Sequence, residues 1–287
     1  MRAVRSPAFA GQFYPAGGDI CRRMIAELLP PDTPPAGPGA IVPHAGWVYS
    51  GETAALGISA VGAWHPDVIV VFGAAHGHDR NAASLFGSGA WRTALGEVEV
   101  DEQVATELSR CAHITACEDV HFGEHSIEVQ LPIIQYLMPA VRIVPISVPP
   151  GPHAAAVGQF CGRVAKESAV RVAFLGSTDL THYGPVFWFE PHGHGEAGIR
   201  WAKEVNDRRF VGLIQSCAAE AVVAEAATHH NACGAGAVAA TMAAMRELGA
   251  TRYVELRHTC SAEVMRLGER DPLNSVGYEA GVFLYPE

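Results

Sequence analysis

Apolar residues along the chain gather in short runs that alternate with longer stretches in which they recur every three or four positions. Runs without polar alternation are typical of strands buried on both faces of a sheet, and the longer period is typical of helices. The predicted strands are Ala40–Pro43, Asp67–Gly73, Val141–Val148, Arg171–Gly176, Arg252–His258 and Gly277–Tyr285. The predicted helices are Gly51–Val61, Asp101–Cys111, Ser126–Met138, Ala154–Glu167, Glu196–Ile214, Ala218–Thr228 and Gly234–Leu248.

This alternation predicts an α/β fold in which helices flank a central, largely parallel or mixed sheet. The Pro- and Gly-rich stretch Pro30–Gly39 follows a short amphipathic helix, but too little chain precedes it to bury a separate core. Of the 287 residues, 49% are hydrophobic and 17% are charged, which is enough apolar side chain for one large core. We therefore expect a single domain over residues 1–287.

Net charge and cysteine usage narrow the classes of partner that the protein can bind. With 20 Lys and Arg against 30 Asp and Glu, the net charge of −10 argues against nucleic-acid binding, which needs a clustered basic surface. Neither a signal peptide nor an apolar run of about 18 residues is present, so we expect a cytoplasmic protein without a membrane partner. Seven cysteines without a CxxC pair predict neither a disulfide framework nor a zinc finger. A small molecule or a protein is the expected partner.

Histidines follow several of the predicted strands. His44 comes directly after the first, His76 follows the second, and Asp179 and His182 follow the fourth. Ligands of open α/β sheets gather where the strands end at their carboxyl edge. We therefore expect these side chains to meet at one edge of the sheet.

The first two histidine segments each allow two interpretations. Small residues, Ala45 and Gly46, follow His44 and let the backbone approach a ligand closely, although a turn histidine that caps the next helix would look the same. The second segment offers either His76 or His78 as a ligand, and an ordinary surface turn is the competing interpretation.

Three further segments carry polar side chains with competing interpretations. Asp179 and His182 can hydrogen-bond so that the carboxylate fixes the imidazole tautomer, or they can be a capping Asp and a solvent-facing His. Cys233 precedes an Ala-rich helix whose N-terminus lowers a thiol's pKa, unless it is simply a buried cysteine. His125 and Glu128 lie one turn apart, where helix capping is preferred to a role toward a substrate.

Together these segments resemble the Memo family, whose bacterial members are often labelled AmmeMemoRadiSam system protein B. The family is structurally similar to class III extradiol dioxygenases, non-haem iron enzymes that open aromatic rings with molecular oxygen. The matching stretches run in family order and span nearly the whole chain: Ala10–Pro15, Pro43–Gly46, Gly73–His76, Glu124–Glu128, Ser177–Gly184 and Cys233–Gly234.

The resemblance implies iron or copper bound by His44, His76 and Cys233. It also implies that His182 corresponds to the catalytic base of the dioxygenases, oriented by Asp179. The dioxygenases complete their metal triad with a Glu, and the thiolate in its place here is a softer ligand that favours copper or zinc.

We therefore expect a non-haem, metal-dependent oxidoreductase of the extradiol-dioxygenase-like type, with a small-molecule substrate. Fe(II) is the favoured metal, and Cu or Zn is the alternative. Weaker candidates for the substrate pocket are Tyr14, Trp47, Tyr49, His125 and Tyr183. Two other functions fit the same residues: a non-catalytic metal-binding or redox protein that works with a partner such as a radical SAM enzyme, and a zinc hydrolase.

Overall fold

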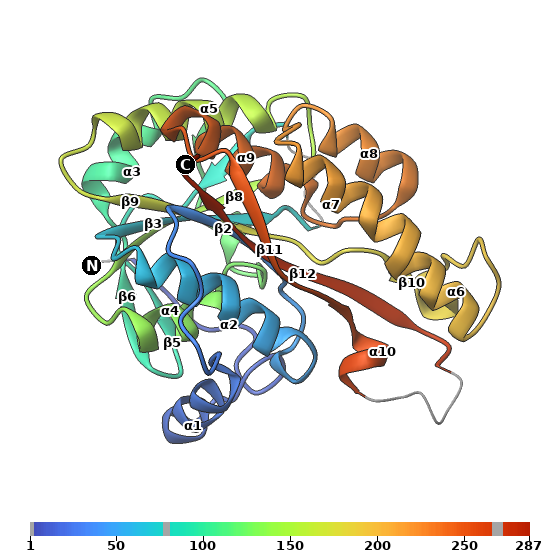
Figure 1. The fold of residues 1–287 in the computed structure, drawn as a ribbon. Helices are drawn as coiled ribbons and strands as arrows, with labels where there is room; N and C mark the ends of the chain where they lie inside the picture. Colours follow the sequence, from blue (N-terminus) through green and yellow to red (C-terminus); the bar gives the residue numbers. More distant parts are fainter. Residues whose placement is uncertain (1–2, 77–80, 266–271) are drawn as a thin grey trace.

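The apolar runs predicted as strands form the centre of one mixed sheet (Figure 1). The computed structural model describes residues 3–76, 81–265 and 272–287. Four parallel strands lie side by side in the order β2 (Gly39–Val42), β9 (Val172–Ser177), β3 (Val68–Ala74) and β8 (Arg142–Val148). Nearly all their residues are buried, which explains why these segments lack polar alternation.

Antiparallel strands extend the sheet on both sides. β12 (Ser275–Leu284) pairs with β2 and carries β11 (Arg252–Cys260), and β10 (His182–Tyr183) pairs with its first residues. Beyond β8 lie β4 (Ala83–Leu85) and β7 (Ile114–Ala116). A smaller sheet is built from β1 (Val4–Arg5), β5 (Ala90–Thr93) and β6 (Gly96–Glu99).

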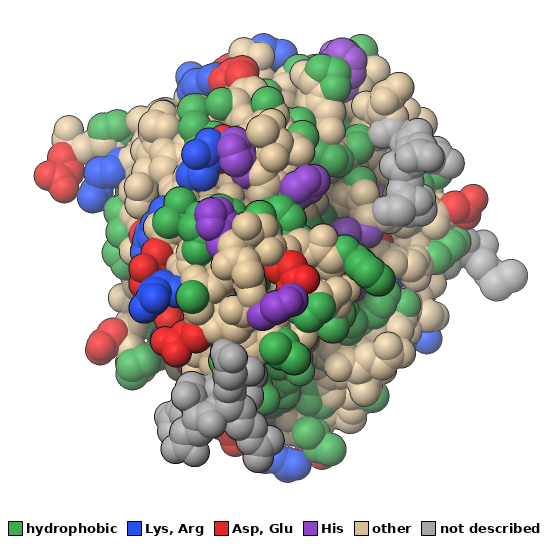
Figure 2. Space-filling view, turned by 90° about the vertical axis from the view of Figure 1, so that its right-hand side faces the viewer, with side chains coloured by type: hydrophobic (Ala, Val, Ile, Leu, Met, Phe, Trp, Pro, Cys, Tyr) green, Lys and Arg blue, Asp and Glu red, His purple; other side chains and the backbone are tan. Residues whose placement is uncertain are grey.

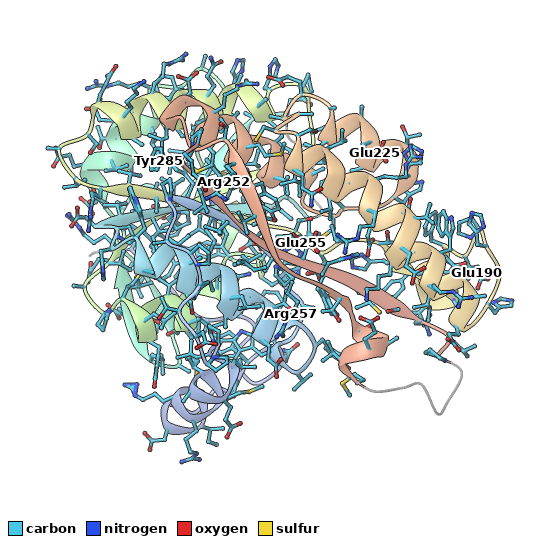
Figure 3. All side chains as sticks on the ribbon, in the orientation of Figure 1. Glu190, Glu225, Arg252, Glu255, Arg257 and Tyr285 are labelled. Atoms are coloured by element: carbon cyan, nitrogen blue, oxygen red, sulfur yellow. The ribbon has the colours of Figure 1, made fainter. Side chains whose placement is uncertain are left out.

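Helices cover both faces of the sheet, and side chains fill the space between the layers (Figure 3). α9 (Ala235–Leu248) packs on β9, β3 and β2, with α5 (Ala154–Glu167) against its outer side; α2 (Trp47–Ala63) covers the other face at β2 and β12. The small side chains of α9 are buried from Ala235 to Met245, because this helix lies between the sheet and α5. The other helical elements are α1 (Gly18–Leu28), α3 (Glu102–Leu108), η1 (Asp119–His121), η2 (Glu128–Gln130), α4 (Leu131–Leu137), η3 (Pro185–Phe187), α6 (Glu196–Trp201), η4 (Ala202–Asp207), α7 (Arg208–Gln215), α8 (Val222–His229) and α10 (Ser261–Val264).

The predicted α/β fold with a mixed sheet flanked by helices is confirmed. Two predicted helices differ in detail: Ser126–Met138 is a 3₁₀ turn followed by α4, which starts where Pro132 occupies the first turn, and Glu196–Ile214 contains the π-helical turn η4. Strands β4 to β7 were not predicted, because three or four residues are too few to show a period. Among helices of the described residues, none is long and apolar enough to cross a lipid bilayer.

A buried ion pair ties the N-terminal segment to the rest of the chain. The side chains of Arg5 and Glu128 are both 0% exposed and form a charge-assisted hydrogen bond. Glu128 also accepts hydrogen bonds from the backbone N–H groups of Ala8 and Phe9, each at 2.9 Å, and from the Tyr14 hydroxyl at 2.9 Å. Both charges are therefore compensated, as burial requires.

Glu128→Ala is expected to lower the free energy of unfolding by about 3–5 kcal/mol, because it leaves the Arg5 guanidinium buried without its partner. Urea unfolding followed by circular dichroism measures the change. Glu107→Ala is the matched control, since it breaks an exposed ion pair with Arg110 that contributes at most about 1 kcal/mol. Equal losses in the two variants would contradict the assignment.

Candidate metal centre

The loops that follow β2, β3 and β9 meet at one edge of the sheet, because β9 lies between the other two strands. His44, His76, Asp179 and His182 line a single cleft of about 580 Å³ there, as their strand-end positions predict, and His125 joins them. Several histidine side chains are visible on the face of the molecule drawn in Figure 2.

The tautomer of His44 is set by the hydroxyl group of Ser177. Its Nδ1 lies 2.9 Å from Ser177 Oγ, and that hydroxyl donates its only proton to the Ser126 carbonyl at 2.9 Å. The hydroxyl must therefore accept from His44, so the imidazole carries its proton on Nδ1. His44 Nε2 is left with a lone pair, which is what a metal ligand needs.

His76 and His125 complete a group of three imidazoles. Their rings stack with centroids 4.7 Å apart, and each lies edge-on to His44 at 5.3 and 5.2 Å. Phe9 and Phe13 pack against His125 and fix its ring. Within the described residues, the His, Cys, Asp and Glu atoms that form a group of three, all within 4.8 Å of one another, are those of these histidines. His78, the alternative to His76, lies outside the described residues.

All three imidazoles are neutral at physiological pH. Burial lowers the pKa of His44 well below the ordinary imidazole value, and the nearby His125 and His76 lower it further. Desolvation followed by the charge of His76 lowers the pKa of His125 to about 4. Desolvation also lowers the pKa of His76, although this residue keeps contact with solvent at the cleft. Neutral imidazoles are the form that binds metals.

Cys233 lies beside His44, with Sγ 3.2 Å from Nε2. The Asp179 backbone N–H donates to the sulfur at 3.3 Å. Gly234 allows this approach, because a Cβ there would lie 2.2 Å from the Ser177 carbonyl oxygen. The sulfur is not a member of the three-histidine group, yet its distance from His44 suits two ligands of one ion.

The prediction that the start of α9 lowers the pKa of Cys233 is wrong for the metal-free protein. Burial raises the pKa of the thiol, and the Asp179 carboxylate raises it further. The sulfur is therefore a thiol, and its proton must leave before it can bind a metal.

The prediction that Asp179 orients the His182 ring is wrong, because Asp179 bonds instead to the loop that carries His44. Its Oδ1 accepts from the backbone N–H of His44 at 2.7 Å, while Nδ1 of His182 lies 3.0 Å from the Leu180 carbonyl. Burial raises the pKa of Asp179 to about 6, although the charge of His182 and the backbone N–H groups of His44 and Ala45 oppose the rise. His182 thus has its tautomer fixed by the backbone, with Nε2 left as the acceptor.

The predicted helix-capping role belongs to Glu124 and not to Glu128. The Glu124 carboxylate accepts the Ile127 N–H at 2.9 Å, and its burial raises its pKa to about 7. Glu128 faces inward to Arg5. His125, predicted for the substrate pocket, lines the cleft and also belongs to the three-histidine group. The bond between Glu124 and Ile127 holds the turn that follows His125 and so places this residue.

Of the other residues predicted for the substrate pocket, Tyr49 lines the cleft. Tyr14, Trp47 and Tyr183 do not: each is at most 3% exposed. The Tyr14 and Tyr183 hydroxyls and the Trp47 indole N–H donate to partners that do not line the cleft. Aromatic residues near a motif are often core residues, and these three pack in the interior.

The far wall of the cleft was not predicted. The pairing of β10 with β12 brings the start of β12 next to His182, and α10 adds to it. The only sequence signal was the predicted strand from Gly277, which includes Tyr278 of this wall but begins two residues after the start of β12. The residues on this wall are Phe187, Ser261, Met265, Asn274, Ser275, Val276 and Tyr278.

The donor set fits a transition metal. Three neutral imidazole nitrogens and one sulfur suit iron, copper or zinc, and they do not suit magnesium or calcium, which prefer oxygen ligands.

Comparison with known proteins gives matches over nearly the whole chain. A family model described as Memo-like protein matches residues 5–282. A MEMO1 family protein of Methanopyrus kandleri is 36% identical and the match covers 97% of this chain and 98% of that protein. A second, from Methanothermobacter thermautotrophicus, is 35% identical over 96% of this chain and 98% of its own.

The solved structures include one with the same fold. The crystal structure of an uncharacterized protein from Escherichia coli K12 matches with a TM-score of 0.54 at 11% sequence identity, covering 85% of this chain and 99% of that one. At this identity the match shows a shared fold only.

His44→Ala is expected to lose bound metal, whereas His182→Ala is expected to keep most of it. Both imidazoles line the cleft, but only His44 belongs to the three-histidine group. The loss in affinity for His44→Ala should exceed the roughly 10- to 100-fold that removing a hydrogen-bond partner of a ligand costs. Metal content after dialysis, measured by mass spectrometry, tests this, and equal loss from both variants would make His182 a ligand.

Zn²⁺ binding at about pH 8 is expected to release about one proton per chain. The imidazoles are already neutral because their pKa values are lowered, whereas the raised pKa of Cys233 keeps its thiol protonated until the metal binds. Affinity should therefore rise with pH, by about tenfold per unit. Calorimetry in buffers of different ionisation enthalpy counts the protons. Cys233→Ser should release almost none, and the same result in the wild-type protein would exclude Cys233 as a ligand.

Proposed function

The chain belongs to the Memo family, and we propose that it is a metal-dependent oxidoreductase that acts on a small molecule bound in the cleft. The observation that carries the proposal is the group formed by His44, His76 and His125, whose ligand atoms all lie within 4.8 Å of one another. Three protein nitrogens leave coordination positions for other ligands, as in non-haem iron sites. When bound, a redox-active metal would supply the electrons that activate dioxygen.

His182 is proposed as the group that moves a proton. The Leu180 carbonyl accepts from Nδ1, so Nε2 can take a proton from a substrate held in the cleft that His182 lines. Asp179 is proposed to act by holding His44 in place through the backbone N–H of that residue. Phe187 packs edge-on to the His182 ring, with centroids 5.1 Å apart, and helps to fix the orientation of that ring.

Iron is the proposed metal, and the sulfur of Cys233 supports copper or zinc as a second candidate. Sγ lies 3.2 Å from His44 Nε2, and a soft donor in the metal shell favours these ions. With zinc, the same ligands would activate water, and the protein would be a hydrolase.

Protein purified from its own host and reconstituted anaerobically with Fe(II) is expected to consume oxygen when mixed with a panel of dihydroxylated aromatic compounds. An oxygen electrode measures the rate, and elemental analysis of the protein before reconstitution identifies the native metal. His182→Ala should keep the metal and lose about a hundred- to ten-thousand-fold in rate. His44→Ala is the metal-free control.

Native zinc with no oxygen consumption, together with ester or amide hydrolysis that a chelator abolishes, would replace this proposal with the hydrolase. Oxygen consumption that is the same in His44→Ala as in the wild-type protein would contradict a role for the metal.

A further inference from the structure

A buried turn from a distant element holds the loop that carries Asp179 and His182. The turn is η4, where the helical segment from α6 to α7 widens into a π-helix. Asp207 Oδ1 accepts the backbone N–H of Thr181 at 3.0 Å, and Asn206 Nδ2 donates to the Thr181 hydroxyl at 3.1 Å. The two η4 side chains are each 1% exposed. Thr181 is therefore fixed at both its backbone and its side chain.

The same turn also holds the segment that leads to Cys233. Asn206 Nδ2 donates to the His229 carbonyl at 2.9 Å, and Asn231 Nδ2 donates to the Asn206 carbonyl at 3.0 Å. Glu225 of α8, labelled in Figure 3, accepts from the same Asn231 amide at 3.2 Å. One helical turn thus joins the loop of Asp179 and His182 to the segment that leads to Cys233.

Strand β12 also bonds to the loop of Asp179 and His182. Leu180 N–H donates to the Gly277 carbonyl at 2.8 Å, and Gly277 N–H donates to the Thr181 carbonyl at 3.0 Å. A Cβ at Gly277 would lie 2.2 Å from Asp207 Oδ2, so only glycine lets the carboxylate come this close. The other neighbour of Oδ2 is Nε2 of His258, at 3.2 Å, and both side chains are 1% exposed.

This arrangement is costly for the fold. Burial raises the pKa of Asp207, although hydrogen bonds from His258 and Thr181 oppose the rise. Three buried atoms of the same cluster, His258 Nδ1, Asn206 Oδ1 and Asn231 Oδ1, have no protein hydrogen-bond partner within the described residues. Apolar side chains of similar volume would fill the space at lower cost, and π-helical turns occur often at functional sites.

We propose that Asp207 is a positioning residue that holds the loops of Asp179 and Cys233 in register at the metal centre. The inference rests on the proposed metal function. Few contacts separate Asp207 from the metal centre. Asp207 fixes Thr181, and Asp179 lies two residues before Thr181. Asp179 accepts the His44 N–H at 2.7 Å and donates its own N–H to Cys233 Sγ at 3.3 Å.

Two measurements on Asp207→Ala test the proposal. Hydrogen exchange of the metal-free protein, read by mass spectrometry, should speed up in residues 178–182 and 230–234 and stay unchanged in β3 and α9. Co²⁺ affinity, measured by competition with a chelator, should fall by about 10- to 100-fold, with a changed visible spectrum. Asp207→Asn should restore both, because its amide oxygen can still accept the Thr181 N–H.

Glu279→Ala is the matched control, because Glu279 is a buried carboxylate on β12 that bonds the Tyr253 hydroxyl at 3.0 Å instead of the loop. It should change neither measurement. If Asp207→Ala does not fold, Asn206→Ala takes its place with the same expectations, since it removes the bonds to Thr181 and His229.

Unchanged exchange in the two loops, unchanged Co²⁺ affinity, or an equal effect of Glu279→Ala would overturn the proposal. A wild-type protein that does not bind Co²⁺ would instead remove the proposed metal function, and the exchange measurement would still decide whether Asp207 holds the loops.

Discussion

The spacing of parallel strands is the constraint on which the candidate site depends. Neighbouring strands lie about 4.8 Å apart, so two strands separated by one other are about 10 Å apart. β2 and β3 stand in this relation with β9 between them. At that distance His44 and His76 reach one another across the end of β9, and the loop after β9 must pass beside both. The buried apolar runs that make these strands central therefore also bring the histidines together.

Burial then decides the chemical state of each donor. The lowered pKa values of His44 and His125 keep each imidazole neutral, with one unprotonated nitrogen, and the raised pKa of Cys233 keeps its sulfur protonated. The same desolvation raises the pKa of Asp179 to about 6. In a cleft where burial disfavours every charge, a bound cation is strongly stabilised by a nearby carboxylate and thiolate. The neutral imidazoles can bind the cation without first losing a proton.

Apolar runs in the sequence are enough to predict the long strands of the main sheet and the edge at which its parallel strands end, whereas the short strands β4 to β7 give no such signal. The contacts inside the site cannot be predicted from such runs. His125 reaches the other histidines from the loop that precedes the 3₁₀ turn η2, where the Glu124 carboxylate accepts the Ile127 N–H. Asp179, on the loop after β9, accepts the backbone N–H of His44, on the loop after β2. Asp207 acts from a π-helical turn that has no sequence period. The sequence also predicts a pocket position for three residues that lie in the interior, because an aromatic residue near a motif fits the core as well as a pocket. These residues are Tyr14, Trp47 and Tyr183.

The central claim is that one metal ion binds where these loops meet, and anomalous diffraction from crystals of the metal-loaded protein tests it most directly. The account predicts one peak about 2.0–2.1 Å from His44 Nε2 and from one nitrogen each of His76 and His125, with Cys233 Sγ at about 2.3 Å. Crystals that show the peak bound to other residues, or none in the cleft at full metal loading, would contradict it.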